Sequence, residues 1–197
     1  MKRREFSLST ASAVAASALT LPLSMNAQAQ RAFTAGKDFI KLDKPVATDA
    51  PAGKVEVIEF FWYSCPHCNA FEPAFEAWVK KAPANLVVRR IPVAFNARFV
   101  PQQKLYFALE AMNLLPKLHT TVFRAVHVER KPLNKDDAIF EWIGQQGVDV
   151  AKFKEAYNSF NTANMLRKAT QLQDSYRVEG VPSMGVGGKY YTDGTLA

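Results

Sequence analysis

The chain contains 197 residues, of which 48% are hydrophobic and 22% are charged, a composition that is ordinary for a globular protein. Its length indicates one domain, or one domain that carries an insertion. The formal net charge is +7, but the sequence has no arginine-rich tract and no nucleic-acid motif, so we do not expect nucleic-acid binding. We interpret the basic pairs Lys80-Lys81 and Arg89-Arg90 as solvated charges.

Residues 1–29 have the pattern of an export signal. The charged start Lys2-Arg3-Arg4 is followed by a weakly apolar stretch, and Ala27-Gln28-Ala29 fits the small-x-small pattern of a signal-peptidase site. We predict cleavage after Ala29. Pro22 and the serines and threonines of the stretch argue against a permanent membrane span. The arginine pair also resembles a twin-arginine signal, so the export route stays open.

Only two cysteines are present, Cys65 and Cys68, in a protein that we expect to reach an oxidising compartment. Because they are two residues apart, a disulfide between them cannot staple distant parts of the fold. By the chain-entropy model, closing such a small ring stabilises the fold by about 2 kcal/mol, whereas closing a 100-residue loop stabilises it by about 4.7 kcal/mol. A purely structural disulfide would therefore stabilise the fold only weakly.

The first half of the chain predicts a strand, a helix and a second strand. Residues 30–53 read as a loose lead-in with one short strand near 39–42. Residues 55–63 are β-branched and aromatic and predict a long strand that runs directly into Cys65. Apolar residues then recur at helical spacing, with Pro66 suited to the first turn and Pro73 expected to kink the helix. A second strand is predicted over 86–93, and the strand–helix–strand order implies parallel pairing.

Residues 100–177 predict a block of helices, followed by a hairpin. Asn134 and Asp149 are predicted N-caps and Gly147 a predicted stop. A hairpin is expected over 183–192, with its turn at Gly187-Gly188. The apolar helical faces, which we interpret as core, are Leu105, Ala108, Leu109 and Met112; Ile139, Trp142 and Ile143; Phe153, Ala156, Tyr157 and Phe160; and Met165, Ala169, Leu172 and Tyr176.

The Cys65-Pro66-His67-Cys68 motif lies where a strand meets a helix start, a place that favours redox chemistry. Unpaired backbone N–H groups and the helix dipole favour negative charge there, so the pKa of the first cysteine is expected to fall. Cys65 is therefore predicted to be the attacking sulfur, and the more buried Cys68 the resolving sulfur. When protonated, His67 would further favour the thiolate and make the disulfide a stronger oxidant.

Four other interpretations of the motif were weighed. A structural disulfide would stabilise weakly. A zinc half-site needs two further ligands, and the H-x7-H spacing of His119 and His127 misses the usual pattern. A c-type haem needs His directly after the second cysteine, where the sequence has Asn69. A chance motif without function fits poorly with the position between a strand and a helix.

Two further residues fit a redox site. Strand alternation would bury Glu59, whose carboxylate could relay the proton of Cys68; an edge-strand glutamate that reaches solvent is the alternative. Pro182, in Gly180-Val181-Pro182-Ser183, marks a strand start or a special turn because proline is excluded from central strands. A plain loop proline is the alternative there.

The sequence resembles the periplasmic dithiol oxidases of the DsbA family, within the thioredoxin superfamily. The resemblance rests on residues 59–68, on the helical block, and on residues 180–184 and 187–190. It implies an α/β thioredoxin-like fold with an inserted all-helical subdomain. It also implies that Cys65 is the nucleophile, that Pro182 is a cis-proline facing the disulfide, and that Val181 offers backbone hydrogen bonds to a bound peptide. Glu59 occupies the position of the family's buried acid.

The expected organisation is a signal peptide over 1–29, a thioredoxin-like domain over 30–99 and 178–197, and a helical insertion over 100–177. The family's fold continues after the hairpin with a C-terminal helix that covers the sheet. No helical pattern fits in residues 193–197, so we expect that this helix is missing because the chain is truncated; a protein that leaves apolar sheet surface exposed is the alternative.

We therefore predict an enzyme that oxidises cysteine pairs of exported proteins with its Cys65–Cys68 disulfide. No metal and no organic cofactor is expected. Reduced or unfolded exported proteins are the expected substrates, a monomer is the expected state, and the resemblance implies a quinone-linked membrane oxidase as reoxidant in the periplasm. The alternatives are a reductase or isomerase, and a non-catalytic chaperone module with an inert disulfide.

Overall fold

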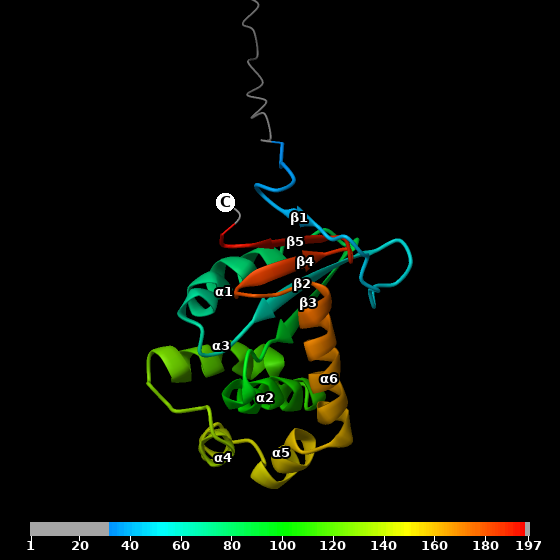
Figure 1. The fold of residues 1–197 in the computed structure, drawn as a ribbon. Helices are drawn as coiled ribbons and strands as arrows, with labels where there is room; N and C mark the ends of the chain where they lie inside the picture. Colours follow the sequence, from blue (N-terminus) through cyan, green and yellow to red (C-terminus); the bar gives the residue numbers. More distant parts are fainter. Residues whose placement is uncertain (1–31, 196–197) are drawn as a thin grey trace, which may run out of the picture. The chain divides into compact units, whose positions relative to one another are not determined.

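The computed structural model describes residues 32–195 of the chain, and from Phe33 on the chain forms one compact unit. The predicted signal peptide and the cleavage site after Ala29 lie outside the described residues. No helix within residues 32–195 is both long enough and apolar enough to cross a bilayer. Figure 1 shows the chain as a sheet of strands with one helix beside it and a group of helices below it.

The sheet has five strands in the order β1-β5-β4-β2-β3. As predicted, β2 and β3 pair in parallel, whereas the β2–β4, β4–β5 and β1–β5 pairs are antiparallel. Strand β2 lies inside the sheet and is buried on both faces because helices pack against both, and its two glutamates, Glu56 and Glu59, are buried with it. The strands are β1 (Ile40–Lys41), β2 (Val55–Phe61), β3 (Leu86–Pro92), β4 (Ser183–Val186) and β5 (Tyr190–Asp193).

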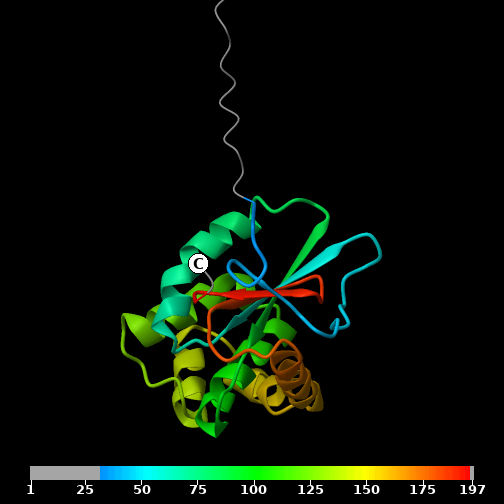
Figure 2. The same ribbon diagram turned by 45° about the horizontal axis from the view of Figure 1, so that its top comes forward.

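The helices divide into one that follows β2 and a block that follows β3. Helix α1 starts directly after Cys65, and Pro73 lies inside it; the expected kink stays a prediction. In Figures 1 and 2, α2 to α5 lie below the sheet, and α6 runs back from them towards it. The helices are α1 (Pro66–Val79), η1 (Ala97–Phe99), α2 (Val100–Ala111), α3 (Leu115–His127), α4 (Asp136–Gln145), α5 (Val150–Tyr157) and α6 (Phe160–Ser175).

The two faces of the sheet meet different helices. On one face Glu59 of β2 is joined through Arg90 of β3 to α1. On the other face Phe60 contacts Tyr176, the C-cap residue of α6, with 5.3 Å between ring centroids. The sheet is therefore held between α1 and the end of α6, and the division into a thioredoxin-like domain and a helical insertion over 100–177 stays a proposal.

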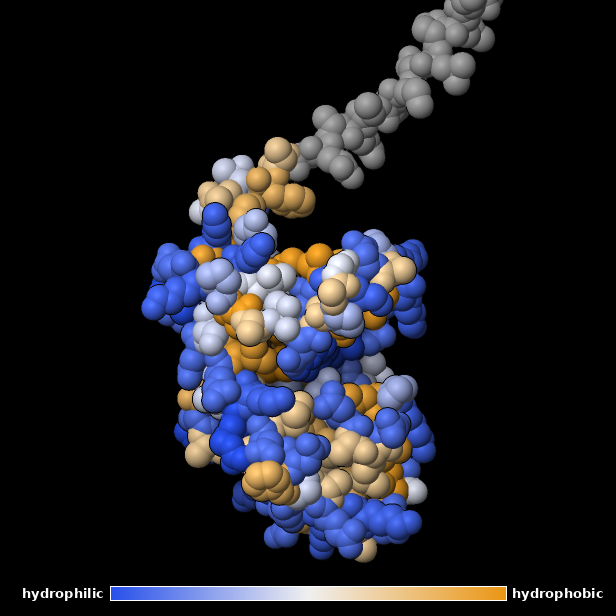
Figure 3. All heavy atoms as spheres, turned by 90° about the vertical axis from the view of Figure 1, so that its right-hand side faces the viewer, coloured by the Kyte–Doolittle hydropathy of each residue, from blue (hydrophilic) through white to orange (hydrophobic). Residues whose placement is uncertain are grey.

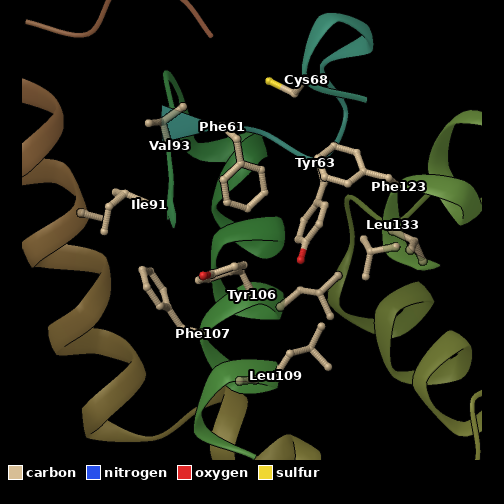
Figure 4. Close-up of a cluster of buried hydrophobic side chains, with 14 of the residues drawn as sticks. Phe61, Tyr63, Cys68, Ile91, Val93, Tyr106, Phe107, Leu109, Phe123 and Leu133 are labelled. Atoms are coloured by element: carbon tan, nitrogen blue, oxygen red, sulfur yellow. The ribbon is translucent and has the colours of Figure 1, made fainter. Parts of the chain in front are cut away.

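An aromatic cluster joins the end of β2 to the helical block. Phe61 lies 5.1 Å from Tyr63 and 5.3 Å from Tyr106 of α2, and Tyr63 lies 5.1 Å from Phe123 of α3, all between ring centroids. Figure 4 shows these rings gathered beneath Cys68. The residues that lead into the cysteine motif are thus part of the main core.

The surface seen in Figure 3 is mainly hydrophilic, with smaller apolar patches. Lys80 and Lys81 are exposed, as predicted, but the prediction of solvated charges was wrong for Arg89 and Arg90. Both arginines lie on β3 and form ion pairs with buried glutamates. The pair Arg89-Arg90 did not reveal these partners in the sequence, because Glu56 and Glu59 lie on the neighbouring strand β2.

Several predicted local signals can be compared with the helix ends. Asp149 caps α5 by accepting from the N–H groups of Ala151 and Lys152, as predicted. The predicted cap of α4 was wrong by one residue, because Lys135 rather than Asn134 is the N-cap. Phe160 was wrongly placed on a core face: α5 ends before it, and it starts α6 with 77% of its surface exposed.

The hairpin turn lies where it was predicted. Gly187 and Gly188 both have positive φ, at 57° and 67°, in the three-residue loop 187–189 that joins β4 to β5. At Gly188 the space is also closed, because an added Cβ would lie 2.0 Å from the carbonyl oxygen of Val46. The turn therefore packs against the lead-in segment. Position 188 requires glycine both because its φ is positive and because a Cβ would clash with Val46.

Candidate active site

The cysteine motif sits at the start of α1, as the sequence predicts. Cys65 is the N-cap with an extended backbone (φ −77°, ψ 118°), and Pro66 occupies the first turn, where its missing N–H costs nothing. The Cys65 N–H donates to the Trp62 carbonyl oxygen at 3.0 Å, which closes a tight turn between β2 and α1. The strand end thus delivers the Cys65 sulfur to the free N–H groups of the helix.

The environment of Cys65 stabilises its thiolate. The pKa of Cys65 is lowered to about 6, first by a hydrogen bond from the Cys68 side chain, then by the backbone N–H groups of Cys68 and His67, with a contribution from the His67 charge. Burial acts in the opposite direction but does not dominate. The Cys68 N–H lies 3.4 Å from Cys65 Sγ. At neutral pH this sulfur therefore carries most of a negative charge.

Cys68 is the more protected of the two sulfurs. It has no exposed surface, whereas Cys65 keeps 6%. Its pKa is raised far above the ordinary thiol value, first by its hydrogen bond to Cys65 and then by burial. Both cysteines are free thiols, so the structure describes the dithiol form. The pKa of Cys65 is lowered and that of Cys68 is raised. Cys65 is therefore the sulfur suited to react with a partner, and Cys68 is the sulfur that stays within the protein.

The chain segment before β4 completes the site from the other side. The Val181–Pro182 peptide bond is cis, as the resemblance implies, so the alternative of a plain loop proline is wrong. Cys65 Sγ lies 3.4 Å from the Val181 carbonyl oxygen and donates to it as a thiol. Two segments separated by more than a hundred residues thus meet at one sulfur.

Glu59 is buried on the α1 face of β2, with only 1% of its surface exposed. The alternative of an edge-strand glutamate is wrong because β2 lies between β4 and β3. Burial raises the pKa of Glu59 to about 8, although its ion pair with Arg90 acts to lower it. The Glu59 carboxylate in turn contributes to raising the pKa of Cys68. A protonatable group therefore lies within electrostatic reach of the resolving sulfur.

Sequence reasoning missed the cation that holds this acid. Arg90 Nε donates to Glu59 Oε2 at 3.0 Å, and its NH2 group contacts Glu72 at 3.2 Å and Glu76 at 2.6 Å. The Arg90 guanidinium thus forms ion pairs with three carboxylates, one on β2 and two on α1. This sharing explains why burial outweighs the ion pair in setting the pKa of Glu59.

Two other residues beside the motif, Phe99 and Gln102, were also missed. The Trp62 ring stacks on Phe99 with centroids 3.9 Å apart, and Gln102 Nε2 donates to Ser64 Oγ at 2.7 Å. Phe99 and Gln102 come from the η1–α2 junction. No local pattern marks them, because they reach the motif only once the helical block has packed.

The remaining histidines lie at different places. His67 is exposed in the first turn of α1. His119 and His127 lie on α3, and both contact Tyr63. Within residues 32–195, no group of three or more His, Cys, Asp or Glu side chains is arranged to hold a metal ion.

Comparison with known proteins assigns the family. A family model described as the DSBA-like thioredoxin domain matches residues 90–196. The thiol:disulfide interchange protein DsbA of Bordetella parapertussis is 43% identical over 190 residues, which cover 96% of this chain and 87% of that protein. The protein of the same name from Burkholderia cepacia is 46% identical over 167 residues, covering 84% and 79%.

Solved structures agree in fold. The crystal structure of Pseudomonas aeruginosa DsbA has a TM-score of 0.78 at 40% identity, covering 82% of this chain and 83% of that one. The Neisseria meningitidis oxidoreductase NmDsbA1 has a TM-score of 0.72 at 28% identity, covering 81% and 84%. The predicted thioredoxin-like fold is confirmed. With a thiolate-stabilising helix start, a cis-proline and these relatives, the chain belongs to the DsbA-like thioredoxin family.

Proposed function

We propose that this protein oxidises cysteine pairs of exported proteins by transferring its Cys65–Cys68 disulfide to them. The observation that carries the proposal is the position of Cys65 at the start of α1, with its Sγ 3.4 Å from the Cys68 N–H, which stabilises the thiolate. A disulfide whose reduced form is stabilised in this way gives up its bond readily. The names of the relatives, thiol:disulfide interchange protein DsbA, support the same reaction class.

The reaction follows from the asymmetry of the two sulfurs. A substrate thiolate attacks Cys65 Sγ, the Cys65–Cys68 bond breaks, and the Cys68 sulfur leaves with the electron pair and takes up a proton. A second substrate thiolate then attacks the substrate sulfur of the mixed disulfide, and Cys65 leaves as its stabilised thiolate. Two electrons pass from the substrate dithiol to the protein, and the substrate gains a disulfide.

The other residues have supporting roles in this scheme. Glu59 exchanges a proton with Cys68 as the latter changes charge, since its pKa of about 8 lies near working pH. His67 adds positive charge beside Cys65 when protonated, and Pro66 opens the helix. We expect the Val181 carbonyl oxygen and N–H, next to Pro182, to pair with the backbone of a bound substrate peptide.

The cellular setting is part of the proposal. The protein is exported, cut after Ala29 and active in the periplasm as a monomer. It uses no metal or organic cofactor. A quinone-linked membrane oxidase restores the Cys65–Cys68 disulfide after each turnover.

Mixing the oxidised protein with a reduced two-cysteine peptide tests the proposal. One peptide disulfide is expected to form for each protein dithiol produced, and Cys65→Ser is expected to be inactive. Reduced Cys68→Ser, given a one-cysteine peptide as its mixed disulfide with glutathione, is expected to release glutathione and to stay joined to the peptide through Cys65. If the oxidised protein left the peptide reduced, the chaperone alternative would be favoured; if the reduced protein instead cleaved a peptide disulfide to completion, the reductase alternative would be.

A further inference from the structure

Tyr63 is held from both of its ends by the two histidines of α3. Its hydroxyl lies 2.8 Å from His119 Nδ1, and its backbone carbonyl oxygen lies 2.8 Å from His127 Nε2. Tyr63 is two residues before Cys65, in the turn that connects β2 to α1. A helix of the helical block therefore contacts the segment that presents the reactive sulfur, through two independent hydrogen bonds.

The direction of each bond follows from the groups involved. A carbonyl oxygen only accepts, so His127 Nε2 donates its N–H to Tyr63. Burial raises the pKa of Tyr63 well above its ordinary value, so the phenol keeps its proton and is able to donate it to His119 Nδ1. His119 Nε2 then carries the ring's proton and lies 3.4 Å from Glu72 Oε1. The negative charge of Glu72 at this distance favours the tautomer in which His119 accepts from Tyr63.

The residues around His119 bury its ring and connect it to other polar groups. His119 is buried among Phe61, Tyr106 and Phe123, with ring centroids between 5.2 and 5.8 Å away. Glu72 also contacts Arg90, which holds Glu59. A continuous polar chain therefore runs from Tyr63 through His119, Glu72 and Arg90 to the acid near Cys68.

The turn that Tyr63 belongs to contacts the backbone of Cys65 and the thiol of Cys68. The Trp62 carbonyl oxygen accepts from the Cys65 N–H at 3.0 Å, and the Trp62 backbone also bonds to Cys68. If Tyr63 shifts, the Cys65 backbone shifts with it, and the position of Cys65 Sγ relative to the N–H groups of His67 and Cys68 changes. The stabilisation of the thiolate depends on these distances, since hydrogen bonds weaken steeply as their geometry is lost.

We propose that His119 and His127 are positioning residues for the cysteine pair, which fix the Trp62–Cys65 turn by holding Tyr63 at its hydroxyl and at its carbonyl oxygen. The inference rests on the proposed role of Cys65 as the nucleophile. Helix α3 then helps to set the oxidising strength of the Cys65–Cys68 disulfide, in addition to packing in the core.

A crossed set of amide variants tests the proposal. The Gln side-chain nitrogen reaches the place of a histidine Nε2, whereas the Asn side-chain oxygen reaches only the place of Nδ1. His127→Gln should therefore keep the bond to Tyr63 and His127→Asn should lose it. At position 119 the order reverses, since His119→Asn keeps an acceptor for the Tyr63 hydroxyl and His119→Gln does not.

The Cys65 thiolate is titrated by its ultraviolet absorbance, and the Cys65–Cys68 couple is equilibrated with glutathione. We expect His127→Asn and His119→Gln to raise the Cys65 titration midpoint by about one pH unit, which corresponds to about a tenfold weaker oxidant. His127→Gln, His119→Asn and the exposed-site control Thr120→Ala should stay near the wild type. Tyr63→Phe should match His119→Gln, because it removes the same bond.

The unfolding free energy of the reduced and oxidised forms separates positioning from general stability. A positioning role changes the two forms unequally, whereas a packing role lowers both equally and leaves the titration unchanged. Equal destabilisation without a titration shift, or the same result for Asn and Gln at each position, overturns the proposal. A wild-type protein that itself titrates as an ordinary thiol would instead refute the proposed function.

Discussion

Arg90 Nε lies 3.0 Å from Glu59 Oε2, and this contact joins a strand at the sheet edge to the acid buried near Cys68. The same guanidinium reaches Glu72 and Glu76 of α1. Its side chain is only 16% exposed, and its Cζ also lies 5.0 Å from the centre of the Phe75 ring. Arg90 is thus the shared counter-ion that allows the acidic residues beneath the motif to be buried.

Replacing Arg90 with Met is expected to be strongly destabilising. The change leaves buried Glu59 and Glu72 without their cation, and breaking a buried ion pair in this way costs about 3–5 kcal/mol. Urea unfolding measures the loss. Arg90→Lys should recover only part of it, because one ammonium lacks the fork that reaches several carboxylates. Met at exposed Arg124 is the control; a similar loss there would contradict this account.

Glu59→Gln should change how stability depends on pH. Burial raises the pKa of Glu59 from 4.5 to about 8, so the folded protein binds this proton more tightly than the unfolded chain. The resulting stabilisation is complete below about pH 4.5 and is lost as the pH rises towards 8. The wild type should therefore lose up to about 1.4 kcal/mol per pH unit relative to the variant in that window. Parallel unfolding curves for the two proteins across this range would refute a raised pKa.

Cys68→Ala should raise the pKa of Cys65 from about 6. The hydrogen bond from the Cys68 side chain is the largest cause of the lowered value, and the variant removes it while leaving the helix start in place. The rate of iodoacetamide alkylation against pH reports the thiolate. Its midpoint should move upward but stay below that of a free cysteine, since the backbone N–H groups remain. An unchanged midpoint would mean that the helix start alone stabilises the thiolate.

Gly188→Ala should destabilise the fold far more than Gly53→Ala. Both glycines have positive φ, but a Cβ at Gly188 would lie 2.0 Å from the Val46 carbonyl oxygen, whereas a Cβ at Gly53 meets nothing within 4 Å. We expect about 1 kcal/mol for Gly53→Ala, from the strained backbone alone. Gly188→Ala adds an overpacking cost of about 1–3 kcal/mol or more. Thermal unfolding compares them, and equal shifts would show that the contact with Val46 relaxes freely.

The parts of the fold that follow from local pattern were predictable from the sequence. The long apolar run before Cys65 predicted β2, and the Gly187-Gly188 pair predicted the hairpin. The resemblance to a known family implied the cis bond before Pro182, which no local pattern could have established. The strand order then brings Val181 to Cys65, and that contact depends on the whole sheet.

The parts that could not be predicted depend on long-range packing. Arg90 was interpreted as a solvated charge because its carboxylate partners lie on β2 and α1, distant in sequence. His119 and His127 were weighed only as zinc ligands, since their spacing says nothing about Tyr63.

The equilibrium of the Cys65–Cys68 couple against glutathione tests the central claim most directly. Because the helix start stabilises the Cys65 thiolate, we expect the protein to be a stronger oxidant than the glutathione pool, and to remain largely reduced in buffers that keep thioredoxin oxidised. A potential near that of thioredoxin, at roughly −270 mV, would contradict the claim and reverse the proposed direction of electron flow.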